Sequence, residues 1–282
     1  MCIRDRYSNA KIMQYILIAI TVIIPVLIAF ITNFSNLRID DTSWIYTIYA
    51  IVVIFGEKIL EIFIDRNKKT AASIQEKFDT NIFDIPENEL LNSVFIDHDI
   101  VRKYSKKDKL NANKISRVTN WYSTRIDCLQ PNIAILFCQR MNICYDQNIK
   151  KKYNKLLISL SVLTFITLLI ISLTNDFSLK KFIIEVILPS IPILNFTYKE
   201  INQNIESVDN LQKLREIIEN KLSSLSRNDV IEIEELRNIQ DRIFNNRILS
   251  PLIPDFIYKI LWTELEDEMN YSVENRIVEL QS

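Results

Sequence analysis

Four long apolar stretches stand out in a chain whose other segments alternate apolar and charged positions at helical spacing. The stretches span 12–32, 44–64, 156–173 and 182–198. A helix of about 20 apolar residues crosses the hydrocarbon core of a bilayer, and the first stretch lacks the small-residue cleavage pattern of a signal peptide. The pattern predicts an all-α membrane protein with four transmembrane helices in two hairpins.

The second stretch contains the only glycine of the chain, Gly56, and charges follow it directly. Glu57 and Glu61 are four residues apart and share one face of a helix. Two interpretations stay open: the acids face water where the helix leaves the membrane, or they line the cytosolic mouth of a pore that favours cations. Glu185 lies one turn inside the fourth stretch, where acids usually face protein or water, and is the third pore-lining candidate.

Glycine and proline also mark candidate hinges. Gly56 interrupts the second stretch, and Pro189 and Pro192 lie one turn apart in the fourth. Membrane helices tolerate proline, although it removes a backbone hydrogen bond and bends the helix. We therefore treat these three residues as gating or hinge candidates.

Basic residues collect on one side of the predicted membrane. They precede the first stretch, follow the second and precede the third, in the segments 4–11, 66–69 and 150–155. Lys180 and Lys181, between the third and fourth stretches, favour the opposite orientation. Because the cytoplasmic flanks of membrane helices are rich in Lys and Arg, we predict a multi-pass protein with both termini in the cytosol.

The polar segments 65–153 and 199–282 are predicted to form a helical cytosolic domain. Residues 131–153 carry apolar positions at spacings of three and four and continue into the third stretch without a helix breaker. One long helix is therefore expected to connect the two parts, with Arg140 and Asp146 as candidate transmitters. A nearly heptad-like stripe over 201–225 allows either packing inside its own domain or self-association.

Composition removes several classes of function. The chain has 34 basic and 35 acidic residues, so its net charge favours no DNA or RNA polymer as a partner. A single glycine excludes glycine-rich phosphate loops, and the single histidine, His98, cannot build a multi-histidine metal site. The cysteines show no CxxC spacing. We therefore expect no cofactor, no metal ion, no catalytic residues and no enzymatic activity.

Arginine side chains are the remaining candidates for binding a small anion. Guanidinium groups bind phosphate through paired hydrogen bonds and need no glycine loop, which makes Arg140, Arg242 and Arg247 the ligand-binding candidates. Arg237, Arg242 and Arg247 follow at intervals of about five residues, which does not keep side chains on one helical face. At most two of them are therefore expected to meet one ligand. The alternative is that each arginine forms an ion pair on the surface of the helical domain.

Several segments occur in an order that resembles a known family. They are IQEKFDTNIFDIP at 74–86, NWYS at 120–123, PNIAILFCQRMNICYDQNIKKKY at 131–153, and NIQDRIFNNR ahead of the proline-rich SPLIPDFIY in 238–258. With two apolar hairpins around the middle block, the chain resembles the SMODS-associated four-transmembrane effector family of bacteria. The resemblance covers nearly the whole chain after the first ten or so residues. MCIRDR fits it poorly, so 1–11 is expected to be a short basic N-terminus of artefactual or truncated origin.

The resemblance implies an activity as well as a fold. Members of that family are pore-forming effectors of anti-phage systems of the CBASS type, which are built around cyclic-oligonucleotide synthases. It implies that a cyclic oligonucleotide second messenger triggers a homo-oligomer to permeabilise the lipid bilayer of the bacterial inner membrane. It supplies no catalytic residues. The alternatives are a non-conducting membrane scaffold that recruits a partner through 201–225 and, less favoured, a small transporter.

Overall fold

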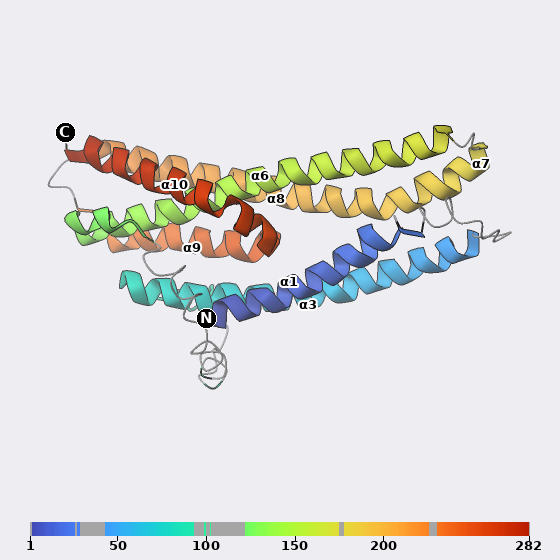
Figure 1. The fold of residues 1–282 in the computed structure, drawn as a ribbon. Helices are drawn as coiled ribbons and strands as arrows, with labels where there is room; N and C mark the ends of the chain where they lie inside the picture. Colours follow the sequence, from blue (N-terminus) through green and yellow to red (C-terminus); the bar gives the residue numbers. More distant parts are fainter. Residues whose placement is uncertain are drawn as a thin grey trace.

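The computed structural model describes residues 2–25, 27–28, 43–92, 99, 102, 122–174, 178–225 and 230–281. Every regular element among these residues is helical. The long helices are aligned along one axis and give the molecule a narrow, elongated shape (Figure 1). The predicted all-α class is therefore confirmed for the described part of the chain.

The first hairpin consists of α1 and α3. The α1 helix (Cys2–Ile18) continues as a π-helical turn, η1 (Ala19–Ile23), and α3 (Ser43–Phe83) runs back beside α1 for 41 residues, a length of about 60 Å. The α3 helix passes Gly56 without interruption and ends before Asp84, whose φ of 50° is the left-handed conformation that commonly ends helices. The second apolar stretch and the polar segment after it therefore form one continuous helix.

The second hairpin consists of α6 and α8. A short 3-10 helix, η2 (Thr124–Cys128), precedes α6 (Pro131–Thr174), which is helical for 44 residues. The chain turns through α7 (Leu179–Phe182) and the π-helical η3 (Ile183–Ile187), and α8 (Leu188–Ser224) returns along α6. The long helix predicted through 131–173 is present, because nothing after Pro131, which suits a first helical turn, breaks it.

The apolar parts of the two hairpins lie together at one end of the molecule, and the polar parts lie at the other (Figure 1). At the polar end, α9 (Ile233–Leu249) and α10 (Asp255–Gln281) pack on α6, and α9 also contacts α3 and α8. We call α9, α10 and the polar halves of α6 and α8 the helical body, against which the polar half of α3 packs.

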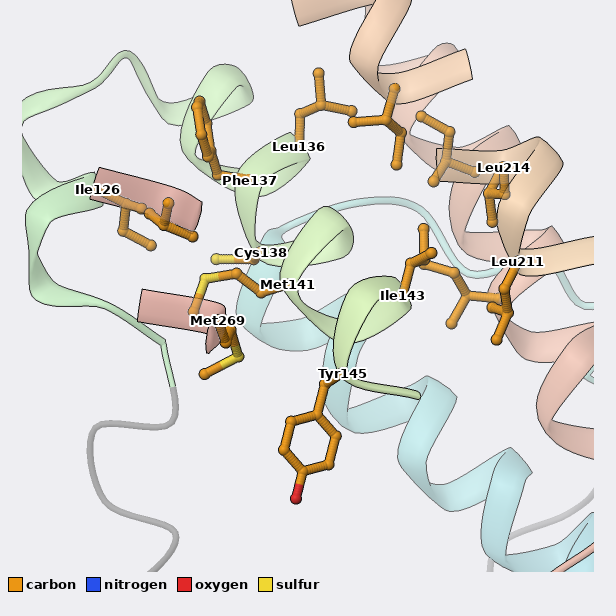
Figure 2. Close-up of a cluster of buried hydrophobic side chains, with 14 of the residues drawn as sticks. Ile126, Leu136, Phe137, Cys138, Met141, Ile143, Tyr145, Leu211, Leu214 and Met269 are labelled. Carbon is orange, nitrogen blue, oxygen red and sulfur yellow. The ribbon is translucent and has the colours of Figure 1, made fainter. Parts of the chain in front are cut away.

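The main hydrophobic core lies inside the helical body (Figure 2). Phe137, Met141 and Ile149 of α6 are fully buried, and Leu214 and Ile218 of α8 pack into the same cluster. Residues from α9 and α10 complete it. From Leu211 to Leu222 the stripe therefore packs inside its own domain, which is one of the two alternatives that its spacing allows, whereas Ile205 is 46% exposed.

One helix in the described part of the chain, α6, is long and apolar enough to cross a membrane by length and composition. Only 18% of its most apolar window is buried, whereas the core helix of a water-soluble protein buries such a window. The helical stretch Tyr7–Ile23 is apolar but shorter, and part of the first predicted span, 29–32, lies outside the described residues. Four transmembrane helices therefore stay a prediction.

Candidate functional site

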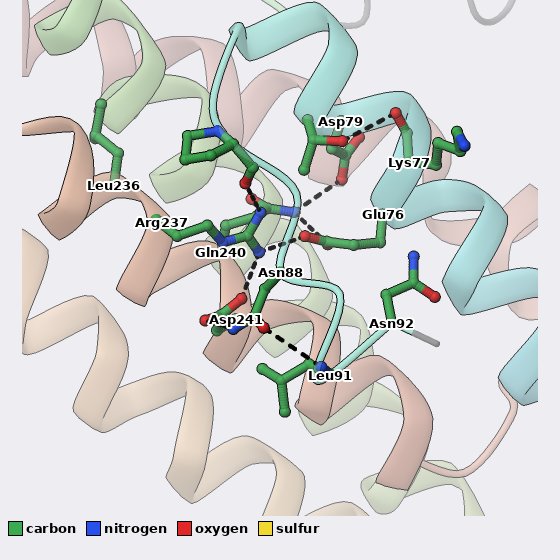
Figure 3. A network of polar contacts seen from close by, with 12 residues as sticks. Glu76, Lys77, Asp79, Asn88, Leu91, Asn92, Leu236, Arg237, Gln240 and Asp241 are labelled. Atoms are coloured by element: carbon green, nitrogen blue, oxygen red, sulfur yellow. Dashed lines mark hydrogen bonds and ion pairs between the residues drawn. The ribbon is translucent and has the colours of Figure 1, made fainter. Parts of the chain in front are cut away.

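The α3 helix is held against α9 by a network of buried charged and amide side chains (Figure 3). We call it the latch network, and its members are Glu76, Asp79, Arg237, Gln240 and Arg247. Arg237 forms an ion pair with Glu76, and Gln240 Nε2 donates to the other carboxyl oxygen of Glu76 at 2.8 Å. Arg247 Nη1 pairs with Asp79 Oδ2 at 2.6 Å. These groups join two helices more than 150 residues apart in the chain.

Burial makes the latch network sensitive to the loss of any partner. Glu76 and Asp79 are 3% and 4% exposed, so their carboxylates have almost no contact with water. Desolvation raises the pKa of Glu76, and the hydrogen bonds from Arg237 and Gln240 oppose the rise. Each carboxylate therefore depends on its arginine for stabilisation of its charge.

The α1 helix contacts the loop before α10 through a second set of polar groups. Gln14 Nε2 donates to the Leu252 carbonyl at 2.7 Å, and the Asp255 backbone N–H donates to Tyr15 Oη at 3.0 Å. Lys11 forms an ion pair with the Asp255 carboxylate. Both helices of the first hairpin therefore make polar contacts with the helical body, in addition to apolar ones such as Phe83 at the end of α3, which packs into the main core.

The second hairpin is attached differently, because its helices supply the main core. Its central polar group is Lys150, which is 2% exposed. Its ammonium donates to Asp146 at 2.6 Å, to Ser207 at 2.8 Å and to Ser250 at 2.8 Å. Burial lowers the pKa of Lys150, and Asp146 opposes this effect. The three bonds use all three donors of the ammonium and join α6 to α8 and to the end of α9.

A cavity of about 600 Å³ lies where α1 and α3 meet α6, α9 and α10. We call it the junction cavity. Its wall includes three cations and two carboxylates, Lys11, Lys150, Arg247, Asp146 and Asp255. It also includes aromatic and amide side chains, namely Tyr7, Tyr145, Tyr258, Trp262, Gln75, Asn142 and Asn246. Its volume is typical of sites for small molecules.

Two further cavities lie on other faces of the helical body. One, of about 420 Å³, we call the strongly basic cavity. Its wall carries five cations and one acid, namely Arg140, Lys151, Lys152, Lys155, Arg215 and Glu268. The other, of about 520 Å³, is lined by α8 and α9 and includes the ion pair between Lys221 and Glu235, 2.7 Å apart. Within the described residues, no group of three or more His, Cys, Asp or Glu side chains is arranged to hold a metal ion.

The predicted ligand-binding arginines are not brought together. Arg140 lines the strongly basic cavity, Arg242 the cavity between α8 and α9, and Arg247 the junction cavity. Arg140 is 4% exposed and binds Glu219 at 2.7 Å and Ser272 at 2.9 Å, which joins α6 to α8 and α10. Arg140 and Arg247 are therefore buried pairs, so the expectation of surface ion pairs is wrong for these two.

The predicted pore-lining acids lie at different depths along the apolar end. Glu61 forms an ion pair with Lys199 at the start of the polar part of α8, and Lys58 lies 3.3 Å from its other oxygen. Glu57 is half-buried one turn earlier on α3, and Glu185 lies in η3. Within one chain, Glu61 therefore joins the two hairpins.

The hinge candidates have different outcomes. Gly56 lies in an unbroken helix with open space around the position of a Cβ atom, so the helix is not interrupted there. Pro189 and Pro192 lie in the first turns of α8, directly after the π-helical η3. A second π-helical turn, η1, occurs in the first hairpin, and such turns mark local departures from regular helix geometry.

The latch network and the Lys150 cluster were not predicted from the sequence. Glu76, Asp79 and Lys150 look like the charged face of an amphipathic helix, because their partners lie far away in the chain. One indication was available. Asn246 in the last turn of α9 and Ser250 directly after the helix provide polar groups where a core-facing segment normally has apolar ones.

The described residues define a class of protein: an all-helical protein with two apolar hairpins, one helix long and apolar enough to cross a membrane, and a polar, ligand-sized cavity where the hairpins join the helical body. The SMODS-associating 4TM effector domain matches residues 2–276 of this chain, which therefore belongs to that family. A probable CBASS effector molecule of Bacillus cereus strain VD146 is 28% identical over 270 residues, which cover 93% of this chain and 88% of the relative. No solved structure matches the chain.

Proposed function

We propose that this protein is a membrane effector of a CBASS-type anti-phage system that permeabilises the bacterial inner membrane when a cyclic oligonucleotide activates it. The family and the Bacillus cereus relative support the role of CBASS effector. Pore formation, the oligomeric state and the activating nucleotide are parts of the proposal. Catalysis is not part of it.

The observation that carries the proposal is the exposure of large apolar side chains on every helix of the apolar end. A protein surrounded by water rarely exposes contiguous apolar surface of this extent, and lipid is the environment in which it is stable. The exposed side chains include Ile16, Ile23, Ile51, Val52, Ile54, Phe55, Ile62, Leu160, Leu163, Ile166, Ile170, Leu173, Ile183, Ile191 and Leu194.

Among the residues that the structure describes, few polar contacts join the helices of the apolar end, as expected for helices in lipid. Ser161 and Thr197 hydrogen bond between α6 and α8 with 2.9 Å between their oxygens, and Tyr49 donates to the Ile20 carbonyl between α3 and η1. Such bonds stabilise helix pairs in membranes. The described residues of a single chain place few such polar contacts between the two hairpins, so we propose that several copies of the chain assemble into a homo-oligomeric pore.

Leakage from liposomes tests the proposal directly. Purified protein in vesicles filled with a dye is expected to release it when cyclic di- or trinucleotides are added, and not without them. Leu163→Arg on α6 and Leu249→Arg on α9 form a matched pair, because the two leucines are 61% and 66% exposed. An arginine at the centre of a membrane helix costs about 3 kcal/mol, so only Leu163→Arg should abolish membrane insertion and leakage. If the two variants behave alike, or no nucleotide releases dye at any protein density, the proposal is wrong.

The orientation can be tested with a native thiol. Cys128 is exposed, whereas Cys138 and Cys144 are buried. In a Cys2→Ser background, a maleimide that does not cross membranes should label Cys128 in inverted vesicles and not in intact spheroplasts. The reverse pattern would contradict a cytosolic helical body.

The scaffold alternative loses its main support. It relied on Leu214 and Ile218 being available for a partner, and both are buried in the core of the helical body. Polar substitutions there are expected to unfold the domain whether or not the protein conducts, so they no longer discriminate between the two functions.

A further inference from the structure

The junction cavity combines ring surfaces, amides and cations in a way that the other two cavities do not. Tyr7, Tyr145, Tyr258 and Trp262 contribute aromatic rings, and stacking of a base on such a ring contributes about 1–3 kcal/mol. Gln75 and Asn142 supply amides that suit the edge of a base. The strongly basic cavity has a single aromatic side chain, Tyr145, in its wall. Its chemistry suits phosphate alone, whereas the junction cavity suits a ring and phosphate together.

A buried donor without a partner also indicates a ligand here. Asn246 is 6% exposed and lines the junction cavity. Its Oδ1 accepts a hydrogen bond from Ser207 Oγ at 3.0 Å, whereas its Nδ2 has no partner. A buried amide donor that stays unpaired is destabilising by about 1–3 kcal/mol. An acceptor on a bound ligand would remove this cost.

We infer that the junction cavity binds an anionic ligand that carries aromatic bases, of the nucleotide class, and that its phosphates compete with Asp255 for Lys11. The inference deepens the proposed function, on which it rests for the consequence of binding but not for binding itself. Asn246 Nδ2 donates to the ligand, Trp262 stacks on a base, and Lys11 and Arg247 contact phosphate.

Competition for these cations connects binding to the hairpins. Lys11 joins α1 to α10 through Asp255, and Arg247 joins α9 to α3 through Asp79. A phosphate that takes either cation leaves the carboxylate without its charged partner, and Asp79 then keeps the 3.3 Å hydrogen bond from Gln240 Nε2. Asp255 then turns to water at little cost because its side chain is 54% exposed. Asp79 is buried, so loss of its partner favours separation of α3 from α9. Ligand binding therefore loosens the first hairpin.

Binding can be followed by the fluorescence of a side chain in the cavity. Trp262 is one of three tryptophans, so a Trp44→Phe/Trp121→Phe protein in detergent reports from this site alone. Cyclic diadenylate, cyclic diguanylate and cyclic triadenylate are the probes, with inorganic phosphate and adenosine as separate arms. At least one cyclic probe should quench Trp262 at a concentration where phosphate and adenosine do not. If none quenches it, and calorimetry on the full wild-type chain detects no binding, the inference is overturned.

An isosteric pair of substitutions tests the contact at Asn246. Asn246→Asp keeps the acceptor for Ser207, removes the unpaired donor and adds a negative charge, so the dissociation constant should rise about tenfold or more. Asn238→Asp makes the same change at an exposed residue of the same helix. Asn238 lines a different cavity, so this variant should leave the dissociation constant unchanged. Equal affinity of the two variants overturns the assignment.

Asp255→Asn tests the competition and gives an effect in the opposite direction. It removes the carboxylate that pairs with Lys11, and because the Asp255 side chain is 54% exposed the affinity should increase only about two- to fivefold. An unchanged or weaker affinity contradicts the competition.

The two proposals can fail separately. If the ligand quenches Trp262 but no dye leaks, the cavity assignment holds and the pore is wrong; if dye leaks normally with Asn246→Asp, the pore holds and the cavity assignment is wrong.

Discussion

Replacement of Arg237 by methionine is the most direct perturbation of the attachment between α3 and α9. The change removes the ion pairs of Arg237 with Glu76 and with Asp241, which lies 2.6 Å away, and the hydrogen bond to the Pro86 carbonyl at 2.9 Å. Glu76 then keeps the bond from Gln240 alone among these contacts. Because Glu76 is 3% exposed, loss of its charged partner should cost about 3–5 kcal/mol, or on the order of 10 °C in the unfolding midpoint.

The pH dependence separates this explanation from a general packing defect. Desolvation already raises the pKa of Glu76, and Arg237 is the first of the groups that oppose the rise. Without Arg237 the pKa rises further, so folded Glu76 takes up a proton at higher pH than the unfolded chain does. A carboxyl pKa raised by folding reduces stability as the pH increases through that pKa. The deficit of Arg237→Met should therefore be largest in alkaline buffer and shrink on acidification.

The measurement is a thermal scan by far-UV circular dichroism in detergent, at a fixed scan rate because unfolding of such proteins is often irreversible. The double variant Arg237→Met/Glu76→Gln should recover much of the lost stability, since it removes the buried charge. Arg125→Met is the matched control: its ion pair with Glu274, at 3.0 Å, joins side chains that are 63% and 44% exposed, so it should change stability little. A double variant as unstable as the single one, or a deficit independent of pH, would refute the reasoning.

Three further predictions concern other buried or paired charges. Burial raises the pKa of Glu200 to about 7, and its Oε2 has no hydrogen-bond partner. The free energy of unfolding of the wild-type protein should therefore fall by about 3 kcal/mol as the pH rises from about 4.5 to above 7. The melting temperature of Glu200→Gln should not show this dependence on pH. Lys150→Ala leaves Asp146 and two hydroxyls without their donor and should destabilise the protein by about 3–5 kcal/mol in the same scan, whereas an intact melting curve would mean that the cluster is dispensable. The charge reversals Glu61→Lys and Lys199→Glu should each disturb nucleotide-dependent leakage. The double variant should restore leakage if the ion pair joins the hairpins, but not if Glu61 acts in the pore by its charge.

The helical architecture was predictable because it depends on local properties. A run of apolar residues at 156–173, a helix-periodic segment before it and the absence of a breaker between them are sufficient to give α6 as one helix. The same argument applied to α3 would have joined 44–64 to the segment up to Phe83. The charges at 65–69 suggested a boundary, but charge alone does not end a helix.

The site was less predictable because it depends on pairs that are distant in the sequence. Arg247 was a candidate because a guanidinium group binds phosphate through paired hydrogen bonds, and it does line the junction cavity. Its partner Asp79 lies 168 residues earlier, and one sequence without covariation gives no indication of that contact. Arg242 was selected by the same criterion and faces a different cavity, since five residues along a helix turn the side chain to another side.

The different attachment of the two hairpins determines which of them can move at low cost. Separation of α6 from α8 would expose the core around Phe137, Met141 and Ile218, at about 25 cal/mol for each Å² of apolar surface, and no ligand in the junction cavity replaces those contacts. The first hairpin contributes Phe83, at the end of α3, to that core, and is otherwise held by Glu76, Asp79 and Lys11 and by a small apolar cluster at Ala10, Leu17, Ile64, Phe196 and Leu252. A phosphate can exchange with a carboxylate for the same cation, so binding energy acts directly on these contacts. Movement of α1 and α3 against a fixed α6 and α8 is therefore the expected route from ligand to membrane.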